Sequence, residues 1–222
     1  MKILFIGNSF TYFNDMPEAI FKDIARQNGR DIEVASVTKG GYTLSKFADK
    51  TDEYGAMVES ILSSERFDAV VLQEQSRTPI SDPDAFKTAV RALYERIKIT
   101  GARVYLYATW GYEASHPKLS LYGSTTYDME MKLRSAYQEI AGELGVTVLN
   151  VGKAMSFAYK AGVKTLYKED KYHPDLCGSV LAATVIYSTV FECDPKELSL
   201  SFVGVDSGDM ASLVDAAAYV LE

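Results

Sequence analysis

A serine, an aspartate and a histidine in this sequence have the side-chain types that acyl transfer uses. Ser9 lies in the segment Gly-Asn-Ser-Phe-Thr (7–11), directly after an apolar run. The chain has only two histidines, and one of them, His173, follows Asp170 in an Asp-x-x-His pattern. A serine hydroxyl becomes a good nucleophile when a base takes its proton, and an aspartate bound to that base fixes its tautomer. These residues therefore predict a Ser-His-Asp hydrolase.

Apolar runs of strand length alternate along the chain with stretches in which apolar residues have helical spacing. Strands are expected at 2–6, 32–37, 68–73, 103–108 and 146–150. Helices are expected at 16–28, 54–64, 84–99, 127–144, 174–191 and 210–221. Continuous apolar strands between helices are typical of a parallel sheet covered on both faces. We therefore expect an α/β fold, a three-layer α/β/α sandwich with a parallel five-stranded, flavodoxin-like sheet, built as a single domain over residues 1–222.

In such sheets ligands bind beyond the carboxyl ends of the strands. Small, polar or aromatic residues follow four of the expected strands: Ser9, then Gly40 and Gly41, then Gln73 and Gln75, then Trp110. Pro174 suits the first position of a helix, which would keep His173 in the loop before the helix expected at 174–191. We expect all of these residues at one edge of the sheet.

This set resembles the SGNH (GDSL-type) hydrolase family. The family has a serine after the first strand, a glycine after the second, a polar amide after the third and a terminal Asp-x-x-His. The resemblance covers residues 2 to about 191. It implies the SGNH hydrolase fold and an esterase in which Ser9 is the nucleophile, His173 is the base and then the acid, and Asp170 orients the histidine.

The resemblance also implies an oxyanion hole that includes the backbone N–H groups of Ser9 and Gly41. A glycine suits this place because it leaves no Cβ in the way of a substrate. Two blocks depart from the family pattern. This chain has Gly-Asn-Ser-Phe (7–10) where the family usually has Gly-Asp-Ser-Leu, and it has Gln-Glu-Gln (73–75) where the third block of the family has Gly-x-Asn. Gln75 or Gln73 could supply the missing amide, and we favour Gln75 because it lies further beyond the sheet edge.

The family resemblance implies a small-acyl ester as substrate, and O-acetyl groups on carbohydrates in particular, as for an acetylesterase. An aromatic ring at the rim would suit the apolar face of a sugar, and the candidates are Trp110, Tyr12, Tyr42 and Tyr112. Trp110 is expected at the rim because it directly follows the fourth strand. His116 has no carboxylate at a comparable distance in the sequence, and we interpret it as an exposed loop residue.

The composition argues against several other classes of protein. A net charge of −7 disfavours nucleic acid and anionic membranes as partners. No apolar run is long enough to cross a membrane, and the apolar start is interpreted as a strand, so a cytoplasmic protein is expected, although a chain without its leader would look the same. Neither a metal nor an organic cofactor is expected, because metal-ligand clusters and nucleotide-binding motifs are missing. Cys177 and Cys193 are expected to be reduced thiols.

Two alternatives to an active esterase stay open. A flavodoxin-like module could bind an anion or a cofactor in the loop after the first strand, with Ser9 and Thr11 as ligands. The bulky Phe10, Tyr12 and Phe13 fit such a phosphate cradle poorly. An SGNH fold without activity is the second alternative, because the third block is changed.

Overall fold

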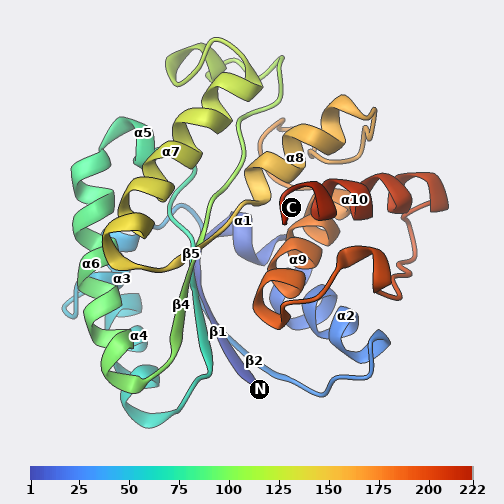
Figure 1. Ribbon diagram of the computed structural model, residues 1–222. Coiled ribbons are helices and arrows are strands. Elements are labelled where there is room, and N and C mark those ends of the chain that lie inside the picture. Colours follow the sequence, from blue (N-terminus) through green and yellow to red (C-terminus); the bar gives the residue numbers. More distant parts are fainter. Residues whose placement is uncertain (222) are drawn as a thin grey trace.

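The computed structural model describes residues 1–221, and its centre is a parallel sheet of five strands (Figure 1). The strands are β1 (Lys2–Gly7), β2 (Glu33–Thr38), β3 (Ala69–Leu72), β4 (Arg103–Tyr107) and β5 (Thr147–Leu149). They lie in the order β2-β1-β3-β4-β5, and every neighbouring pair is parallel. The α/β sandwich with five parallel strands that the sequence predicts is confirmed.

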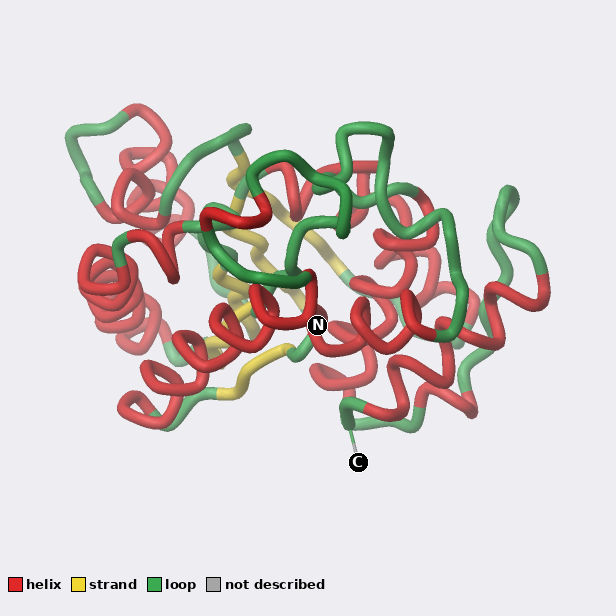
Figure 2. Tube along the Cα trace, turned by 90° about the horizontal axis from the view of Figure 1, so that it is seen from above, coloured by secondary structure: helices red, strands yellow, loops and turns green. Residues whose placement is uncertain are grey.

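Helices cover both faces of the sheet, as the view from above shows (Figure 2). They are α1 (Ser9–Tyr12), α2 (Lys22–Gln27), α3 (Leu44–Ala48), α4 (Glu53–Ser64), α5 (Thr78–Ser81), α6 (Pro83–Thr100), α7 (Thr126–Leu144), α8 (Val151–Lys160), α9 (Leu176–Phe191) and α10 (Ser207–Tyr219). Short 3-10 turns lie at η1 (Phe13–Asp15), η3 (Leu119–Leu121) and η4 (Pro195–Glu197), and η2 (Met16–Phe21) is a π-helical segment. None of the helices within residues 1–221 is long and apolar enough to cross a membrane.

Side chains of β1 alternate between two apolar layers. Ile3 and Phe5 belong to the layer under α8, α9 and α10, whereas Leu4 and Ile6 belong to the layer under α3, α4 and α6 (Figure 1). All four side chains are fully buried. A strand that is covered on both faces carries no polar alternation, which explains the continuous apolar run in the sequence. β1 is therefore a rigid base for the residues that follow it.

The segment after β1 is helical earlier than the sequence predicts. Ser9 is the first residue of the one-turn helix α1, where a simple turn was expected. Asn14 and Asp15 then adopt left-handed backbone conformations with φ of 55° and 52°, which interrupt the helix. Asn and Asp are among the few non-glycine residues that tolerate this region. The helix expected at 16–28 begins at Met16 after this interruption and runs on without a break, as η2 and then α2, to Gln27.

The helix expected at 174–191 begins at Leu176, so the predicted place of Pro174 at its first position is wrong. Asp175 caps the helix, and its side chain accepts a hydrogen bond of 2.9 Å from Leu176 N. Pro174 lies before the cap and forms an isolated antiparallel bridge with Tyr167. A capping aspartate satisfies a free N–H of the first turn, which a proline at that position cannot do. His173 still lies in the loop before the helix.

The C-terminal helix α10 packs against the helices α8 and α9 on one side of the sheet (Figure 1). Its buried residues Leu213, Ala216 and Ala217 join the apolar layer of α9. Cys177 and Cys193 are free thiols, as the sequence predicts. No group of histidine, cysteine and carboxylate side chains within residues 1–221 is arranged to hold a metal ion.

Candidate active site

The carboxyl ends of the central strands bring three loops to one place. Gly7 of β1 pairs in register with Thr38 of β2, and Ile6 pairs with Leu72 of β3. β1 is the strand at which the strand order reverses, and ligands of such sheets bind at this switch point. A cleft of about 320 Å³ lies there, lined by Asn8, Ser9, Phe10, Tyr12, Phe13, Gly40, Gly41, Gln75, Ser76, Tyr172 and His173.

Ser9, His173 and Asp170 form a continuous chain of hydrogen bonds in this cleft. Ser9 Oγ lies 2.8 Å from His173 Nε2, and His173 Nδ1 lies 2.7 Å from Asp170 Oδ2. A carboxylate only accepts hydrogen bonds, so the neutral imidazole donates from Nδ1 and its Nε2 accepts from the serine hydroxyl. Ser9 is only 8% exposed. The structure thus brings together three residues that the sequence separates by up to 164 positions.

Asp170 is held in place by the turn that it forms with His173. Its Oδ1 accepts hydrogen bonds from the backbone N–H groups of Tyr172 (3.3 Å) and His173 (3.0 Å). Partial burial acts to raise the pKa of Asp170, but the hydrogen bonds from the His173 ring and from these two N–H groups lower the pKa below its ordinary value. Asp170 is therefore ionised at neutral pH, as a partner for an imidazolium must be.

Aromatic rings enclose the imidazole of His173. Phe13 stacks on it with a centroid distance of 4.3 Å and an interplanar angle of 14°. Tyr172 packs at 4.0 Å, and Phe10 presents an edge at 5.7 Å. The His173 side chain is consequently only 13% exposed, although it lies in a loop. This packing restricts the ring to the orientation in which Nε2 faces Ser9.

Asn8 ties the Ser9 turn to the loop that follows β2. Its Oδ1 accepts a hydrogen bond of 3.2 Å from Phe10 N and so caps α1. Its Nδ2 donates to the carbonyl of Tyr42 at 3.0 Å. An aspartate at this place could accept from Phe10 N but could not donate to Tyr42, so the asparagine of the first block has its own structural use.

The two candidate amides of the third block have different surroundings. Gln73 is fully buried, and its Oε1 accepts from Asn8 N (2.9 Å) and from Thr11 Oγ1 (2.8 Å). Its Nε2 donates to the carbonyl of Glu74, and Gln73 does not line the cleft. Gln73 thus lies below the Ser9 turn and outside the cleft, which favours Gln75 as the oxyanion donor.

Gln75 lines the cleft and is half-buried. Its Oε1 accepts from Arg77 N at 3.1 Å and from Thr78 Oγ1 at 3.3 Å, which directs the amide nitrogen away from these groups. Nε2 donates one hydrogen bond to Ser76 Oγ at 3.1 Å. An amide nitrogen carries two hydrogens, so a second one is available to a ligand.

The two glycines after β2 line the cleft for different reasons. Gly41 has φ of +72°, a left-handed conformation that glycine adopts without strain. A Cβ on Gly41 would meet no atom of the protein within 4 Å, so within the protein it is the backbone conformation that favours glycine here. A Cβ on Gly40 would lie 2.9 Å from Tyr12 Oη.

The expected rim position of Trp110 is wrong. Trp110 is fully buried and stacks on Phe10 with a centroid distance of 4.6 Å and an interplanar angle of 5°. Its Nε1 donates to the carbonyl of Tyr172 at 2.9 Å. It therefore supports the cleft from behind, because segments distant in the sequence cover the end of β4.

Only one of the tyrosines that the sequence suggests lines the cleft. Tyr12 does so and is 39% exposed. Tyr42 does not line the cleft, and its hydroxyl lies 3.4 Å from Asp52 Oδ2. Tyr112 is buried with its hydroxyl 2.9 Å from Ser76 Oγ. His116 lies outside the cleft and is half-buried, against the expectation of an exposed residue, and its Nδ1 accepts from Lys118 N.

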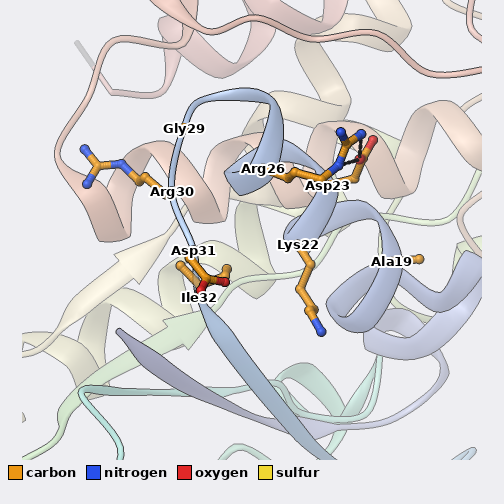
Figure 3. A pocket seen from close by; sticks show the side chains of 8 residues that line it. All are labelled: Ala19, Lys22, Asp23, Arg26, Gly29, Arg30, Asp31 and Ile32. Atoms are coloured by element: carbon orange, nitrogen blue, oxygen red, sulfur yellow. Dashed lines mark hydrogen bonds and ion pairs between the residues drawn. The ribbon is translucent and has the colours of Figure 1, made fainter.

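A larger hollow on another part of the surface has no comparable chemistry. It measures about 590 Å³ and lies beside α2 and the loop before β2 (Figure 3). Its charged side chains include Lys22, Asp23, Arg26 and Arg30, and Arg26 is paired with Asp23. It contains no serine, cysteine or histidine that could act as a nucleophile or base. Its volume alone does not make it a functional site.

No protein-family model matches the chain, and neither does any of the curated proteins. Among solved structures, a candidate SGNH hydrolase from Slackia heliotrinireducens is 32% identical, with a TM-score of 0.73. The match covers 86% of this chain and 98% of that chain. The chain belongs to the SGNH hydrolases.

Two further structures share the SGNH fold at lower identity. A DUF4886 family protein from Bacteroides uniformis matches with a TM-score of 0.86 at 21% identity, over 100% of this chain and 94% of that chain. A variant of an acetyl xylan esterase from Geobacillus stearothermophilus matches with a TM-score of 0.60 at 16% identity, over 86% and 93% of the two chains. At these identities the likeness shows the fold alone.

Two side chains, one lining this SGNH cleft and one buried outside it, have contacts that the sequence argument did not find. Phe13 stacks on His173, as described above, and Glu74 is a fully buried carboxylate next to Gln75. The sequence did carry a signal for Glu74, which is an acidic residue directly after an apolar strand. Such a carboxylate is buried with the strand and must then find hydrogen-bond partners. For Phe13, an aromatic residue in the nucleophile loop was the only signal.

Proposed function

We propose that this SGNH-family chain is a serine esterase, with Ser9 as nucleophile, His173 as general base and acid, and Asp170 as the carboxylate that orients the histidine. The observation that supports this most directly is the distance of 2.8 Å between Ser9 Oγ and His173 Nε2, with Nδ1 bound to Asp170. A hydroxyl bound to a base that is itself held by a carboxylate is the arrangement that activates serine at neutral pH.

In the first half of the reaction, Ser9 Oγ attacks the ester carbonyl carbon, and its proton passes to His173 Nε2. The carbonyl π electrons move to oxygen, so a tetrahedral oxyanion forms beside an imidazolium, which the ionised Asp170 stabilises. The oxyanion then collapses, the bond to the alcohol oxygen breaks, and Nε2–H protonates the leaving alkoxide. An acyl-enzyme and a free alcohol remain.

In the second half, His173 takes a proton from a water molecule that attacks the acyl-enzyme carbonyl. The tetrahedral oxyanion forms again, and its collapse breaks the bond to Ser9 Oγ, which regains a proton from Nε2. The acid leaves and the starting hydrogen-bond chain is restored. The chemistry of both halves needs only Ser9, His173 and Asp170 together with donors for the oxyanion.

Three donors around the cleft suit the oxyanion in this proposal. The backbone N–H of Ser9 is the first of α1, and the first N–H groups of a helix have no partner within the helix. Gly41 and Gln75 line the same cleft and would add a backbone N–H and the second hydrogen of an amide. Each such donor is worth about 2.7–4 kcal/mol of barrier in a related type of site.

The proposed substrate is an ester of a small acyl group, in the first place an O-acetyl group on a carbohydrate. A cleft of about 320 Å³ lies at the lower end of the range for ligand pockets, roughly 300–1,000 Å³. Phe10 and the buried Trp110 behind it close the cleft, whereas Tyr12 and Tyr172 offer aromatic surface toward a sugar ring. An acetyl xylan esterase among the structures of this fold agrees with this class.

The test is covalent labelling with a fluorophosphonate probe, followed by mass spectrometry of the labelled peptide and by hydrolysis of p-nitrophenyl acetate and acetylated sugars. We expect label on Ser9 in the wild type and none in Ser9→Ala or His173→Ala. Ser156→Ala is the control, because Ser156 is a buried serine of α8 that does not line the cleft. An unlabelled wild type, or a Ser9→Ala variant that still reacts, would refute the proposal.

A further inference from the structure

Glu74 is a carboxylate without contact with solvent, directly behind the candidate oxyanion hole. Its side chain is fully buried. Among the described residues it takes part in no ion pair, unlike Glu130, the other fully buried glutamate, which is paired with Arg134 at 2.8 Å. Burial of an unpaired carboxylate is costly, so its hydrogen-bond partners must offset a large desolvation penalty.

Those partners are backbone N–H groups of two different loops. Leu44 N donates to both carboxylate oxygens, at 3.1 Å to Oε1 and 3.2 Å to Oε2. Gln75 N donates to Oε1 at 2.6 Å. Leu44 is the first residue of α3 and lies three positions after Gly41 in the same loop. One side chain therefore connects the loop that carries Gly41 with the residue that presents the cleft amide.

We propose that Glu74 is a positioning residue whose carboxylate holds the Gly41 loop and Gln75 at the separation that the oxyanion requires. This inference rests on the proposed esterase function. Glu74 does not line the cleft, so it acts through the two donors and not on the substrate.

The chemistry of a carboxylate fits this place. Its two oxygens only accept hydrogen bonds, and here they face N–H donors from both sides. A glutamine amide has one accepting oxygen, and its NH₂ group would confront Leu44 N. The backbone of Glu74 is fixed separately, because Glu74 N donates to the hydroxyl of Tyr137 at 3.1 Å. The side chain can therefore position its partners from a fixed point.

The altered third block acquires a physical explanation in this way. Gln73 holds the Ser9 turn through Asn8 N and Thr11 Oγ1, and Glu74 holds the Gly41 loop through Leu44 N. Gln75 alone faces the cleft. Two of these three consecutive side chains, Gln73 and Glu74, thus connect the segment after β3 with the loops after β1 and β2.

Burial raises the pKa of Glu74 to about 7, against hydrogen bonds from Gln75 N and Leu44 N, which lower it. Asp82, at the start of α6, adds a repulsion that raises the pKa further. The other titratable group that faces Glu74 is Tyr137 of α7, whose pKa is raised well above its ordinary value by burial, so Tyr137 stays neutral. The Glu74 carboxyl therefore loses its proton in the neutral pH range. Above that range the charged carboxylate accepts the hydrogen bonds from Leu44 N and Gln75 N more strongly.

The first test compares Glu74→Gln and Glu74→Leu with Glu130→Gln, which removes a buried carboxylate that binds Arg134 and does not line the cleft. Rates on p-nitrophenyl acetate are expressed per active site titrated by the burst. We expect kcat to fall about 10-fold in Glu74→Gln and about 100-fold in Glu74→Leu, because displaced donors stabilise the transition state less. KM should stay within about 3-fold, since the ground state uses these donors little.

Glu130→Gln should keep the wild-type kcat. A Glu74→Gln variant with the kcat of the wild type would overturn the positioning role. A folded Glu74→Leu variant with the same kcat would confirm that result. An equal loss in Glu130→Gln would also overturn it, because any buried carboxylate would then have the same effect.

The second test does not depend on turnover. In ¹H–¹⁵N spectra of the wild type, the amide signals of Leu44 and Gln75 should shift together with one midpoint near the pKa of Glu74, and they should lose this titration in Glu74→Gln. Different midpoints for the two amides, or an amide whose signal is the same in the wild type and in Glu74→Gln at every pH, would refute the connection between the two loops even in an active enzyme. An inactive wild type would refute the proposed function and with it the oxyanion role of these donors. The amide titrations would then still show whether Glu74 binds both loops.

Discussion

The ring of Phe13 lies against the imidazole of His173, with centroids 4.3 Å apart and planes 14° from parallel. The two rings come from opposite ends of the chain, and Phe13 belongs to the same short segment as Ser9. The loop that carries the nucleophile therefore also supports the base. Because a stacked ring prevents the imidazole from tilting, the distance from Nε2 to Ser9 Oγ depends on Phe13.

Phe13→Leu should lower kcat on an acetyl ester by about 10-fold, since a small displacement of a reacting group can cost up to about 100-fold. Phe157→Leu is the control, because Phe157 stacks on Tyr219 with centroids 4.6 Å apart and lies away from the cleft. Steady-state kinetics of both variants decides the point. Equal rates for Phe13→Leu and the wild type would show that the imidazole is held without the stack.

Asp170→Asn tests the carboxylate of the proposed triad. The amide could still accept from the backbone N–H groups of Tyr172 and His173, but its NH₂ favours the wrong imidazole tautomer. We expect kcat to fall by roughly 10⁴-fold, as in the serine protease example from which this magnitude comes. Asp175→Asn is the matched control, because asparagine also caps a helix well and Asp175 caps α9 and pairs with Lys168 outside the proposed triad. A loss under 10-fold in Asp170→Asn would contradict the proposed role.

Much of the fold could be predicted because it depends on local pattern. The central strands β1 and β3 are apolar runs, and their burial on both faces follows directly from that composition, whereas the edge strand β2 is only partly buried. The errors lie where a few backbone angles or a cap decide the boundary. Asn14 and Asp15 adopt left-handed conformations that separate α1 from η2, and Asp175 starts α9 two residues after the predicted position. Neither effect changes the hydrophobic pattern.

The site could be predicted only as far as chain order and strand ends determine it. Ser9 and Gly41 follow strands, and the structure places both at the cleft. Trp110 also follows a strand but is buried, because Phe10 and the backbone of Tyr172 cover it. Contacts of that kind join segments more than 60 residues apart, and the spacing of residues in a single sequence does not predict them.

The stability of the protein should depend on pH through Glu74. Its pKa rises from 4.5 to about 7 on folding, so the unfolded chain loses this proton first as the pH increases. The folded state then binds more protons, and the free energy of unfolding falls between these two pKa values and levels off above them. At 1.36 kcal/mol per pKa unit, the fall is about 3 kcal/mol.

Denaturant titrations of the wild type and Glu74→Gln at about pH 5 and about pH 8 measure this effect. The wild type should lose about 3 kcal/mol more than the variant over this interval, because glutamine does not ionise. Parallel pH dependence in the two proteins would show that Glu74 ionises in the folded state as easily as in the unfolded chain.

Gln75 and Gln73 should differ in what their removal changes. Gln75→Ala removes an amide that faces the cleft, so kcat should fall about 100-fold while KM and the free energy of unfolding change little. Gln73→Ala leaves Asn8 N and Thr11 Oγ1 without their buried acceptor, which should cost about 2 kcal/mol or more of stability. Kinetics per titrated active site and denaturant unfolding on both variants separate the two effects. A Gln73→Ala variant of full stability but low kcat, beside an active Gln75→Ala, would reverse the assignment, since Gln73 would then act on the oxyanion.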